Sequence, residues 1–299
     1  MEEHMMGKTL QELTIADNFM FGAVMTLPDN CRRMLELSLD ISVGSVEINT
    51  EKSFLYHPEY KGVRLDVYAK DENNTHYDVE MQVAKKEALA KRTRYYHSQM
   101  DMELLVKGKD YSELPKACVI FICDFDPFEE KKYRYTFQGR CDEKEELLLG
   151  DERFTIFLST KGENTDEVSQ ELIAFLNYVK ANLAESTQEF NDNYVRQLQD
   201  SVKQVKMSRE MGVRYMQLQE LLRDERAEGI AIGRAEGKVE GRREELAKNI
   251  LFILQKREMS PDESLRQAIL SEQDLKYLEH LMDITLEVKS LEEFVQKMR

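Results

Sequence analysis

The chain has 299 residues, of which 41% are hydrophobic and 33% are charged, and its formal net charge at pH 7 is −15. This length and composition fit a folded protein of about two structural units and exclude a disordered chain. The acidity argues against a protein that coats nucleic acid by bulk electrostatics, although it is compatible with an enzyme that has a local basic surface.

The first predicted elements are two helices within residues 1–40, followed by a pair of strands. Asp17 stands just before an apolar run and is a candidate N-cap for the first of these helices. Residues 63–68 and 78–83 alternate apolar and polar side chains with period two, which is typical of strands with one apolar and one polar face. The sequence Asp-Glu-Asn-Asn at 71–74 predicts a tight turn between them.

Further helices and strands follow this pair. A helix is expected from about residue 85 to 105, with its end near Gly108. Residues 117–123 are continuously apolar, which predicts a strand buried on both faces. The remaining candidates are two strands and one helix, at residues 133–137, 154–158 and 166–180. This order predicts a layered α/β domain over residues 1–190.

Residues 191–299 predict an all-helical tail, because charged residues alternate there with Leu, Ile, Val and Met at helical spacing. Ser260-Pro261 and the stretch 271–274 are signals for helix starts. Within the segment 229–241, four glycines recur every four residues: Gly229, Gly233, Gly237 and Gly241. Such a stripe favours the close packing of a second helix, and a flexible linker is the alternative interpretation.

The two alternating strands bring acidic side chains together. A loop of residues 71–75 pairs Lys70 with His76. The same register sets Asp66 directly opposite Glu80, whereas an even-length loop would bury one set of charges. Opposed carboxylates repel each other unless a cation lies between them, and Mg²⁺ takes oxygen ligands of this kind. The alternative is a solvent-exposed polar sheet face without a metal ion.

Basic residues gather just after the second strand, within residues 85–94. Against the acidic Glu87 stand five basic side chains: Lys85, Lys86, Lys91, Arg92 and Arg94. They are interpreted either as contacts to DNA phosphates or as an ordinary solvated helix face. Their position directly after the carboxylates gives the first interpretation more weight.

The sequence lacks the usual signals of secretion, membrane insertion and zinc binding. Residues 1–26 contain no basic segment followed by an apolar one, and no stretch is apolar and uncharged over the length of a bilayer. The cysteines have no paired zinc spacing and favour reduced thiols: Cys31, Cys118, Cys123 and Cys141. We therefore expect a cytoplasmic protein with no membrane partner.

The order of these features resembles a nuclease superfamily. Asp66 is followed on the next strand by Glu-Met-Gln at 80–82, and then by a helix with the sequence Lys-Arg-Thr-Arg-Tyr-Tyr-His-Ser-Gln at 91–99. The opening Asp-Asn-Phe-Met-Phe at 17–21, the stretch 108–114 before the buried strand and the glycine-repeat tail complete the pattern. The chain resembles the PD-(D/E)XK nucleases, and more narrowly the Rpn group of recombination-promoting nucleases and transposases.

This resemblance covers about residues 10–245 and implies a fold and a site. The fold is a PD-(D/E)XK (restriction-endonuclease-like) α/β core, with a mixed sheet flanked by helices, before the helical tail. Asp66 and Glu80 would be metal ligands, joined by the carbonyl group of Met81. Gln82 stands where the pattern usually has a lysine, whose charge helps to orient the attacking water and stabilises charge on phosphate.

Other residues receive roles from the same comparison. Asp17 would approach the metal from the first helix, unless it is only an N-cap, and Gln99 would correspond to a helix glutamine near the site. The cofactor would be Mg²⁺, with Mn²⁺ as the alternative, and the partner would be DNA.

Together these observations predict a Mg-dependent DNA endonuclease that hydrolyses phosphodiester bonds and is linked to recombination or mobile elements. The alternative is a catalytically weak or inactive DNA-binding or scaffolding protein on a nuclease fold. The uncharged Gln82 and the acidic net charge favour this alternative. In either case the helical tail is expected to form a homo-oligomer.

Overall fold

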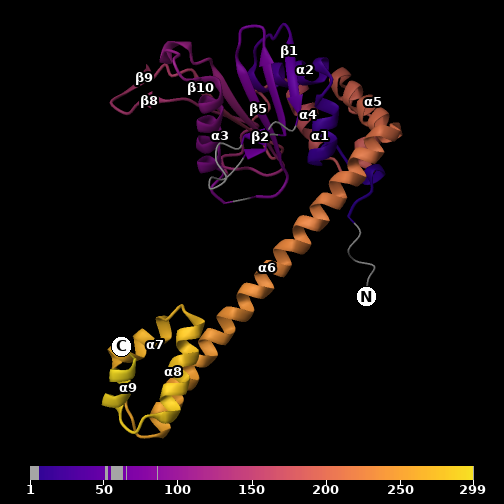
Figure 1. The fold of residues 1–299 in the computed structure, drawn as a ribbon. Helices are drawn as coiled ribbons and strands as arrows, with labels where there is room; N and C mark the ends of the chain where they lie inside the picture. Colours follow the sequence, from indigo (N-terminus) through magenta and orange to yellow (C-terminus); the bar gives the residue numbers. More distant parts are fainter. Residues whose placement is uncertain (1–6, 51–52, 55–62, 65, 86, 299) are drawn as a thin grey trace. The chain divides into compact units, whose positions relative to one another are not determined.

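The structure is a computed structural model (Figure 1), and it describes residues 7–50, 53–54, 63–64, 66–85 and 87–298. By its internal contacts the chain divides into two compact units, Met1–Met216 and Gln217–Arg299. Each unit has a hydrophobic core of its own.

The first unit is built on a six-stranded sheet with the order β1-β4-β5-β6-β10-β7. In that order the strands span Val46–Thr50, Val67–Asp71, His76–Gln82, Ala117–Cys123, Arg153–Ser159 and Arg134–Phe137. β6 pairs in parallel with β5 and β10, while the other neighbours are antiparallel. The predicted α/β class with a mixed sheet is therefore confirmed.

The strand predicted over residues 63–68 is divided between two sheets: β3 (Val63–Arg64) pairs with β2 (Ser53–Phe54), and β4 begins at Val67. A further described pair, β8 (Arg140–Cys141) with β9 (Lys144–Leu148), was not predicted. All residues of β9 are exposed, so that strand has no apolar face that a period-two pattern would reveal.

Helices cover both faces of the sheet. Of the helices that the structure describes in this unit, α3 (Leu89–Leu104) lies on one face (Figure 1). On the other side lie α1 (Asn18–Met25), α2 (Pro28–Leu39) and α4 (Gln170–Lys180), with α5 (Asn193–Met207) packed against them. Short 3₁₀ turns occur at Leu10–Glu12, Tyr111–Glu113 and Glu185–Thr187. Pro28 starts α2 rather than breaking it, because the first helical turn does not need the N–H that proline lacks.

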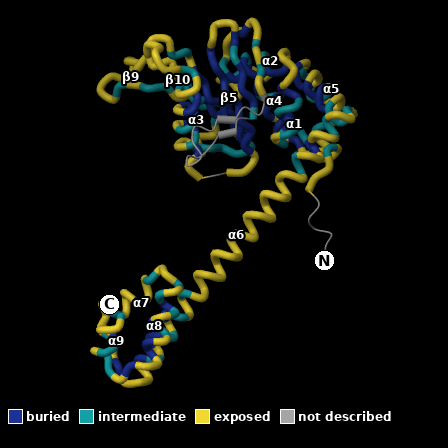
Figure 2. The backbone as a smooth tube through the Cα atoms, viewed as in Figure 1, coloured by how far each residue is buried: buried dark blue, intermediate teal, exposed yellow. Residues whose placement is uncertain are grey.

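The side chains of β5 alternate between the two faces of the sheet. β5 pairs with β4 in the predicted register, with Lys70 opposite His76. The residues that enter the larger hydrophobic core are Tyr77, Val79 and Met81. Those on the α3 side are Asp78, Glu80 and Gln82. All of β5 is buried (Figure 2), so the alternative of a solvent-exposed polar face does not hold, because α3 covers that face.

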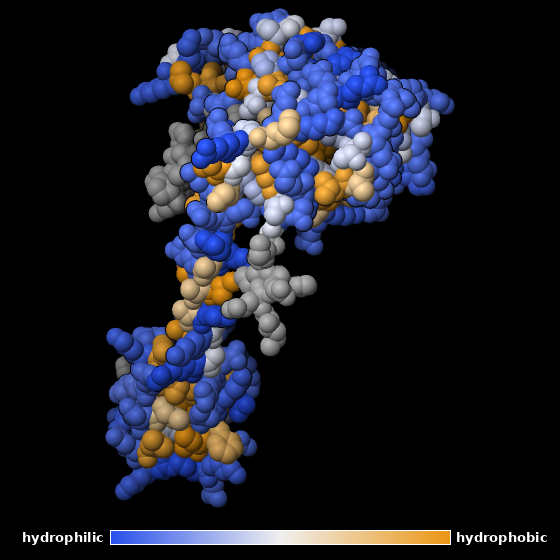
Figure 3. Space-filling view, turned by 90° about the vertical axis from the view of Figure 1, so that its right-hand side faces the viewer, coloured by the Kyte–Doolittle hydropathy of each residue, from blue (hydrophilic) through white to orange (hydrophobic). Residues whose placement is uncertain are grey.

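The second unit is helical, as predicted. Its elements are the C-terminal part of α6 (Arg209–Lys256), α7 (Glu263–Ser271), α8 (Leu275–Glu287) and α9 (Leu291–Lys297). Its core includes Ala247, Ile250, Leu254, Ile269, Leu278, Leu281 and Phe294. Asp262 and Asp274 cap α7 and α8, rather than the predicted Ser260 and Ser271, because Ser271 still belongs to α7. Figure 3 shows hydrophobic side chains among hydrophilic ones on the surface of this unit.

The glycine-repeat segment 229–241 lies within α6 and is exposed along its whole length. A Cβ atom added to any of its four glycines would meet no atom within 4 Å. The segment is thus helical, and packing of a second helix against the stripe stays a prediction. None of the described helices is long and apolar enough to cross a bilayer.

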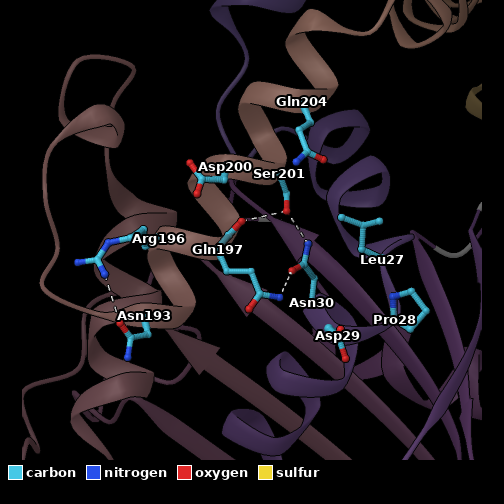
Figure 4. Close-up of a pocket in the computed structure, with 10 residues that line it drawn as sticks. All are labelled: Leu27, Pro28, Asp29, Asn30, Asn193, Arg196, Gln197, Asp200, Ser201 and Gln204. Atoms are coloured by element: carbon cyan, nitrogen blue, oxygen red, sulfur yellow. Dashed lines mark hydrogen bonds between the residues drawn. The ribbon is translucent and has the colours of Figure 1, made fainter.

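The division between the two units falls later than the expected boundary near residue 190. α5 packs on the first unit, and a buried amide joins it to α2 (Figure 4). Asn30 Nδ2 donates to Ser201 Oγ at 3.0 Å, and Gln197 Nε2 donates to Asn30 Oδ1 at 2.7 Å. These residues border a hollow of about 500 Å³. Helical spacing alone does not distinguish a helix packed in this way from the start of a free tail.

Candidate functional site

Asp66 and Glu80 lie side by side where β4 begins and β5 approaches its end. Asp66 N donates to Glu80 Oε1 at 3.1 Å, and Met81 N donates to Asp66 Oδ2 at 3.1 Å. Glu80 is 2% exposed, and Asp66 is half-buried. Each carboxylate is therefore held by main chain from the other strand, as expected for residues that face each other across an antiparallel pair.

Asn18, the first residue of α1, also contacts this site. Its side-chain nitrogen Nδ2 lies 3.0 Å from Asp66 Oδ2 and 3.2 Å from Asp66 Oδ1. The sequence analysis did not assign a role to Asn18, although it belongs to the opening motif at 17–21. Because an amide N–H group donates to a carboxylate oxygen, Asn18 orients the side chain of Asp66.

Asp17 is engaged elsewhere in this structure. It stands at the N-cap position of α1, but its side chain forms no capping hydrogen bond. Its carboxylate accepts instead from Thr14 N at 2.7 Å and from Lys8 Nζ at 2.8 Å. It lines a cavity of about 320 Å³ that neither Asp66 nor Glu80 borders. Donors in the turn before α1, and not the end of the helix, therefore hold this carboxylate, and its approach to a metal ion stays a prediction.

The helix after β5 begins later than predicted. α3 starts at Leu89 rather than near residue 85, because Ala88 has a left-handed φ of 59° and turns the chain there. The helix ends at Leu104, and Gly108 follows with a φ of +95°, close to the predicted end. Arg92 thereby lies in the first turn of α3, above the end of β5.

The guanidinium group of Arg92 points into the site. Its Nη2 donates to Glu80 Oε2 at 2.5 Å, and its Nη1 donates to Gln82 Oε1 at 2.9 Å. Its Nε donates to the hydroxyl of Tyr96 at 2.6 Å, and its Cζ lies 4.9 Å from the centre of the Tyr96 ring. The sequence alone predicts Arg92 either on DNA phosphates or on a solvated helix face. Its contacts with Glu80 and Gln82 depend on how α3 crosses the sheet, which no local pattern contains.

The other basic residues of 85–94 have different surroundings. Lys85 is exposed before α3 and pairs with Glu129 at 2.7 Å. Arg94 is exposed on α3, and Lys86 lies outside the described residues. A role in DNA binding remains a prediction for the whole set: Lys85, Lys86, Arg92 and Arg94.

Gln99 and His97 lie further along α3, and both are buried. Among the described residues, no hydrogen bond joins the side chain of Gln99 to Asp66 or Glu80, and its place near the carboxylates stays a prediction. His97 Nε2 lies 3.0 Å from Thr155 Oγ1, on β10. Burial lowers the pKa of His97 to about 4, so this imidazole is neutral at physiological pH.

The site is rich in buried acids. Burial raises the pKa of Glu80 to about 8, with the charge of Asp66 adding to the shift and Arg92 opposing it. Burial also raises the pKa of Asp78 well above its usual value, with Glu80 and Asp66 as further causes. Both carboxylate oxygens of Asp78 are buried without a hydrogen-bond partner in the described part of the chain. A cation would relieve this concentration of negative charge.

The donors fit a hard divalent cation. Among the described residues, no trio of His, Cys, Asp and Glu side chains is arranged to hold a metal ion. An ion at Asp66 and Glu80 would therefore also need main-chain, water or substrate oxygens, which is usual for Mg²⁺. Asp78 is buried beside this pair, and a bound cation would favour the ionised form of its carboxyl group as well.

Comparison with known proteins identifies the family. No curated protein and no solved structure matches the chain significantly. A family model described as PD-(D/E)XK nuclease family transposase matches residues 34–230, about two thirds of the chain. The matched region contains both carboxylates as well as Gln82 and Arg92. The resemblance to the Rpn group is thereby confirmed, and the chain belongs to the PD-(D/E)XK nuclease family transposases.

Proposed function

We propose that this chain is a metal-dependent DNA endonuclease whose cleavage of phosphodiester bonds is linked to recombination or mobile elements. The observation that supports this most is the pair of Asp66 and Glu80, each held by main-chain hydrogen bonds from the neighbouring strand. The excess of buried acid around them suits a cation. Membership of a nuclease family adds support for a hydrolase.

Asp66, Glu80 and the carbonyl group of Met81 would hold Mg²⁺, or Mn²⁺ as the alternative, together with water and substrate oxygens. When bound, such an ion polarises a phosphodiester and lowers the pKa of a water molecule. Asn18 keeps Asp66 in the orientation this needs. Gln82 lies two residues after Glu80 on the same polar face of β5, and would contribute its side-chain amide to the site.

DNA is the proposed substrate, held by its phosphates. Arg94 on α3 and Lys85 before that helix are exposed, and Lys86 lies between them in the sequence. With a net charge of −15, the chain as a whole repels DNA, so these local charges would have to position it.

The test uses the purified full chain with supercoiled plasmid and Mg²⁺ or Mn²⁺. We expect nicking that stops when the ion is chelated and that is absent from Asp66→Ala. The matched control is Asp142→Ala, which removes an exposed acid of the β8–β9 hairpin and should cleave like the wild type. Equal cleavage by wild type and Asp66→Ala would end the proposal for this site.

A second candidate function is DNA binding or scaffolding without efficient cleavage. It is favoured by the uncharged Gln82 and by Arg92, which already neutralises Glu80 in the structure. Metal-independent DNA binding, with no cleavage by wild type under any ion, would select this alternative.

We also propose that the helical tail self-associates. The glycine stripe is surrounded by open space, and large apolar residues are exposed along the same helix: Leu221, Leu222, Ile230, Ile232 and Val239. Sedimentation of the full chain tests this. Replacing Gly233 and Gly237 by leucine should weaken the assembly by separating the backbones, while the alanine pair should weaken it less. Identical masses for all three chains would exclude the stripe as an interface.

We also propose that the protein acts in the cytoplasm. All four cysteines are free thiols, and three of them are buried. Unpaired cysteines are typical of a reducing compartment.

A further inference from the structure

Position 82 lacks the positive charge that the family pattern usually places there, while a guanidinium group from another element lies beside it. We propose that Arg92 supplies from α3 the catalytic charge that the pattern places on β5, two residues after Glu80. This inference rests on the proposed nuclease function. It assigns to Arg92 a contact with the reacting phosphate, beyond general attraction of DNA.

Arg92 lies beside both Glu80 and position 82. Its guanidinium group bonds both to Glu80 Oε2 and to Gln82 Oε1, at 2.5 and 2.9 Å. A lysine at position 82 would bring its charge to the same polar face of β5. The charge that is missing from the strand is therefore present in the site, delivered by a different element.

Contacts with Tyr96 and Phe121 hold the guanidinium group of Arg92 in one orientation. The Nε donor is bonded to the Tyr96 hydroxyl, and the Cζ atom lies 4.9 Å from the Tyr96 ring centre and 5.3 Å from that of Phe121. A cation held in this way is ordered before substrate binds, so that it can stabilise developing charge without reorganising.

Arg92 also has N–H donors that its protein contacts do not use. A guanidinium group has about five N–H donors, and the hydrogen bonds to described residues use one on each of its three nitrogens. The Arg92 side chain is 32% exposed, whereas that of Glu80 is 3% exposed. Arg92 can therefore keep its protein contacts and still donate to a phosphate oxygen that approaches from solvent.

Gln82 then acts as a positioning residue for Arg92. Its Oε1 accepts from Arg92, and its Nε2 donates to the carbonyl oxygen of Ala84 at 2.7 Å. Both the oxygen and the nitrogen of the amide therefore have hydrogen-bond partners within the protein. Gln82 links β5 to Arg92 on α3 rather than binding the attacking water.

The test moves the positive charge from α3 to β5. Arg92→Gln should lower kcat for plasmid nicking by about 100-fold or more, the loss typical of one transition-state donor, while KM changes little. Gln82→Lys combined with Arg92→Gln should recover at least about tenfold of that loss, because it returns a cation to the strand. Arg92→Lys, which keeps the charge but not the fork, should lie between Arg92→Gln and wild type.

Two further readouts separate catalysis from packing. DNA binding with Ca²⁺ in place of Mg²⁺ and the melting temperature should stay near wild-type values in the double variant. The lysine of that variant should also lose rate at alkaline pH, where it deprotonates, whereas the wild type keeps its charge there.

The possible outcomes distinguish a failure of the Arg92 proposal from a failure of the proposed nuclease function. A wild-type chain that does not cleave ends both. A wild-type chain that cleaves while Arg92→Gln cleaves equally well ends only the role of Arg92. The same conclusion follows if Arg92→Gln loses activity and the double variant recovers none of it, since Arg92 would then serve only as a counter-ion of Glu80.

Discussion

The two faces of β5 are buried to the same degree and differ completely in chemistry. On one face Tyr77, Val79 and Met81 are 0–3% exposed within the larger core, and on the other Asp78, Glu80 and Gln82 are 0–5% exposed under α3. Burying the first set stabilises the fold by roughly 1.5–3 kcal/mol for a large apolar side chain. Burying the second set opposes folding, because carboxylates lose their water. The two faces are equally buried, so the chemistry of their side chains distinguishes them. The apolar face stabilises the fold, whereas the acidic face is explained by a function.

The largest expected effect would come from the acidic face. Glu80→Gln should reduce the rate of metal-dependent cleavage by roughly 10³-fold, because a metal ligand contributes several kcal/mol of transition-state stabilisation. The same change should leave the melting temperature of the metal-free chain unchanged or higher. Plasmid nicking and thermal unfolding measure the two, with Glu146→Gln on the exposed β9 strand as the control. A destabilised but fully active Glu80→Gln chain would reverse our assignment of the two faces.

The apolar face should respond in the opposite way. Met81→Ala should lower the free energy of unfolding by about 2–5 kcal/mol, because it leaves a cavity in the core. Cleavage per folded molecule should persist, since the main-chain groups of residue 81 are unchanged. Urea unfolding and nicking at matched folded concentration test this. Loss of cleavage with little loss of stability would show that the side chain of Met81 belongs to the site.

The acidic face should also make stability depend on pH. Glu80 has a folded-state pKa of about 8 against a usual 4.5, and Asp78 is shifted in the same direction. The folded chain therefore binds more protons than the unfolded chain between these values. Its stability is fully present below the unfolded pKa and is lost as the pH rises toward 8, at up to about 1.4 kcal/mol per pH unit for each group.

Urea unfolding in a chelator at several pH values between 5 and 8 measures this slope. Asp78→Asn should flatten it, because one of the two groups no longer titrates. Saturating Mg²⁺ should also flatten it, since a bound cation favours the ionised carboxylates. A slope that is the same in wild type and in Asp78→Asn would remove Asp78 from the acidic cluster.

The smallest expected effect distinguishes the two sides of α3. Arg94 is exposed and Arg92 is bonded within the site, although they are only two residues apart. Arg94→Ala should weaken DNA binding without regard to sequence and reduce the slope of log affinity against log salt by about 1, with kcat unchanged. DNA titrations at several salt concentrations test this, with Lys203→Ala on α5 as the control for an exposed cation. An unaltered salt slope would place Arg94 on an idle surface.

Local patterns were enough to predict much of this fold. Period-two alternation and the parity of one turn determine how β4 pairs with β5, and a continuous apolar run marks β6. The register of Asp66 and Glu80 follows from those features. What local patterns do not contain is the path of one element over another. The crossing that brings Arg92 onto Glu80, and the packing of α5 on α2, depend on the whole core.

Two single residues show the same limit. Asp17 has the right type and position for a cap, yet its carboxylate finds nearer donors in the preceding turn. Asn18, one residue later, reaches Asp66 across 48 positions of sequence. No propensity distinguishes these two residues, because the angle at which α1 meets the sheet decides between them.

The turn between β4 and β5 has a consequence for the order of folding events. Asp71 Oδ1 accepts from Asn73 N and Thr75 N, so this hairpin closes through contacts between residues a few positions apart. Hairpins of this kind form in about 1–10 μs, whereas parallel pairing with β6 must wait for a long connection to close. Asp66 and Glu80 therefore meet early, while water still surrounds them. We expect their repulsion to become severe only when β6 and α3 pack over them, so that a divalent cation would favour the late steps of folding.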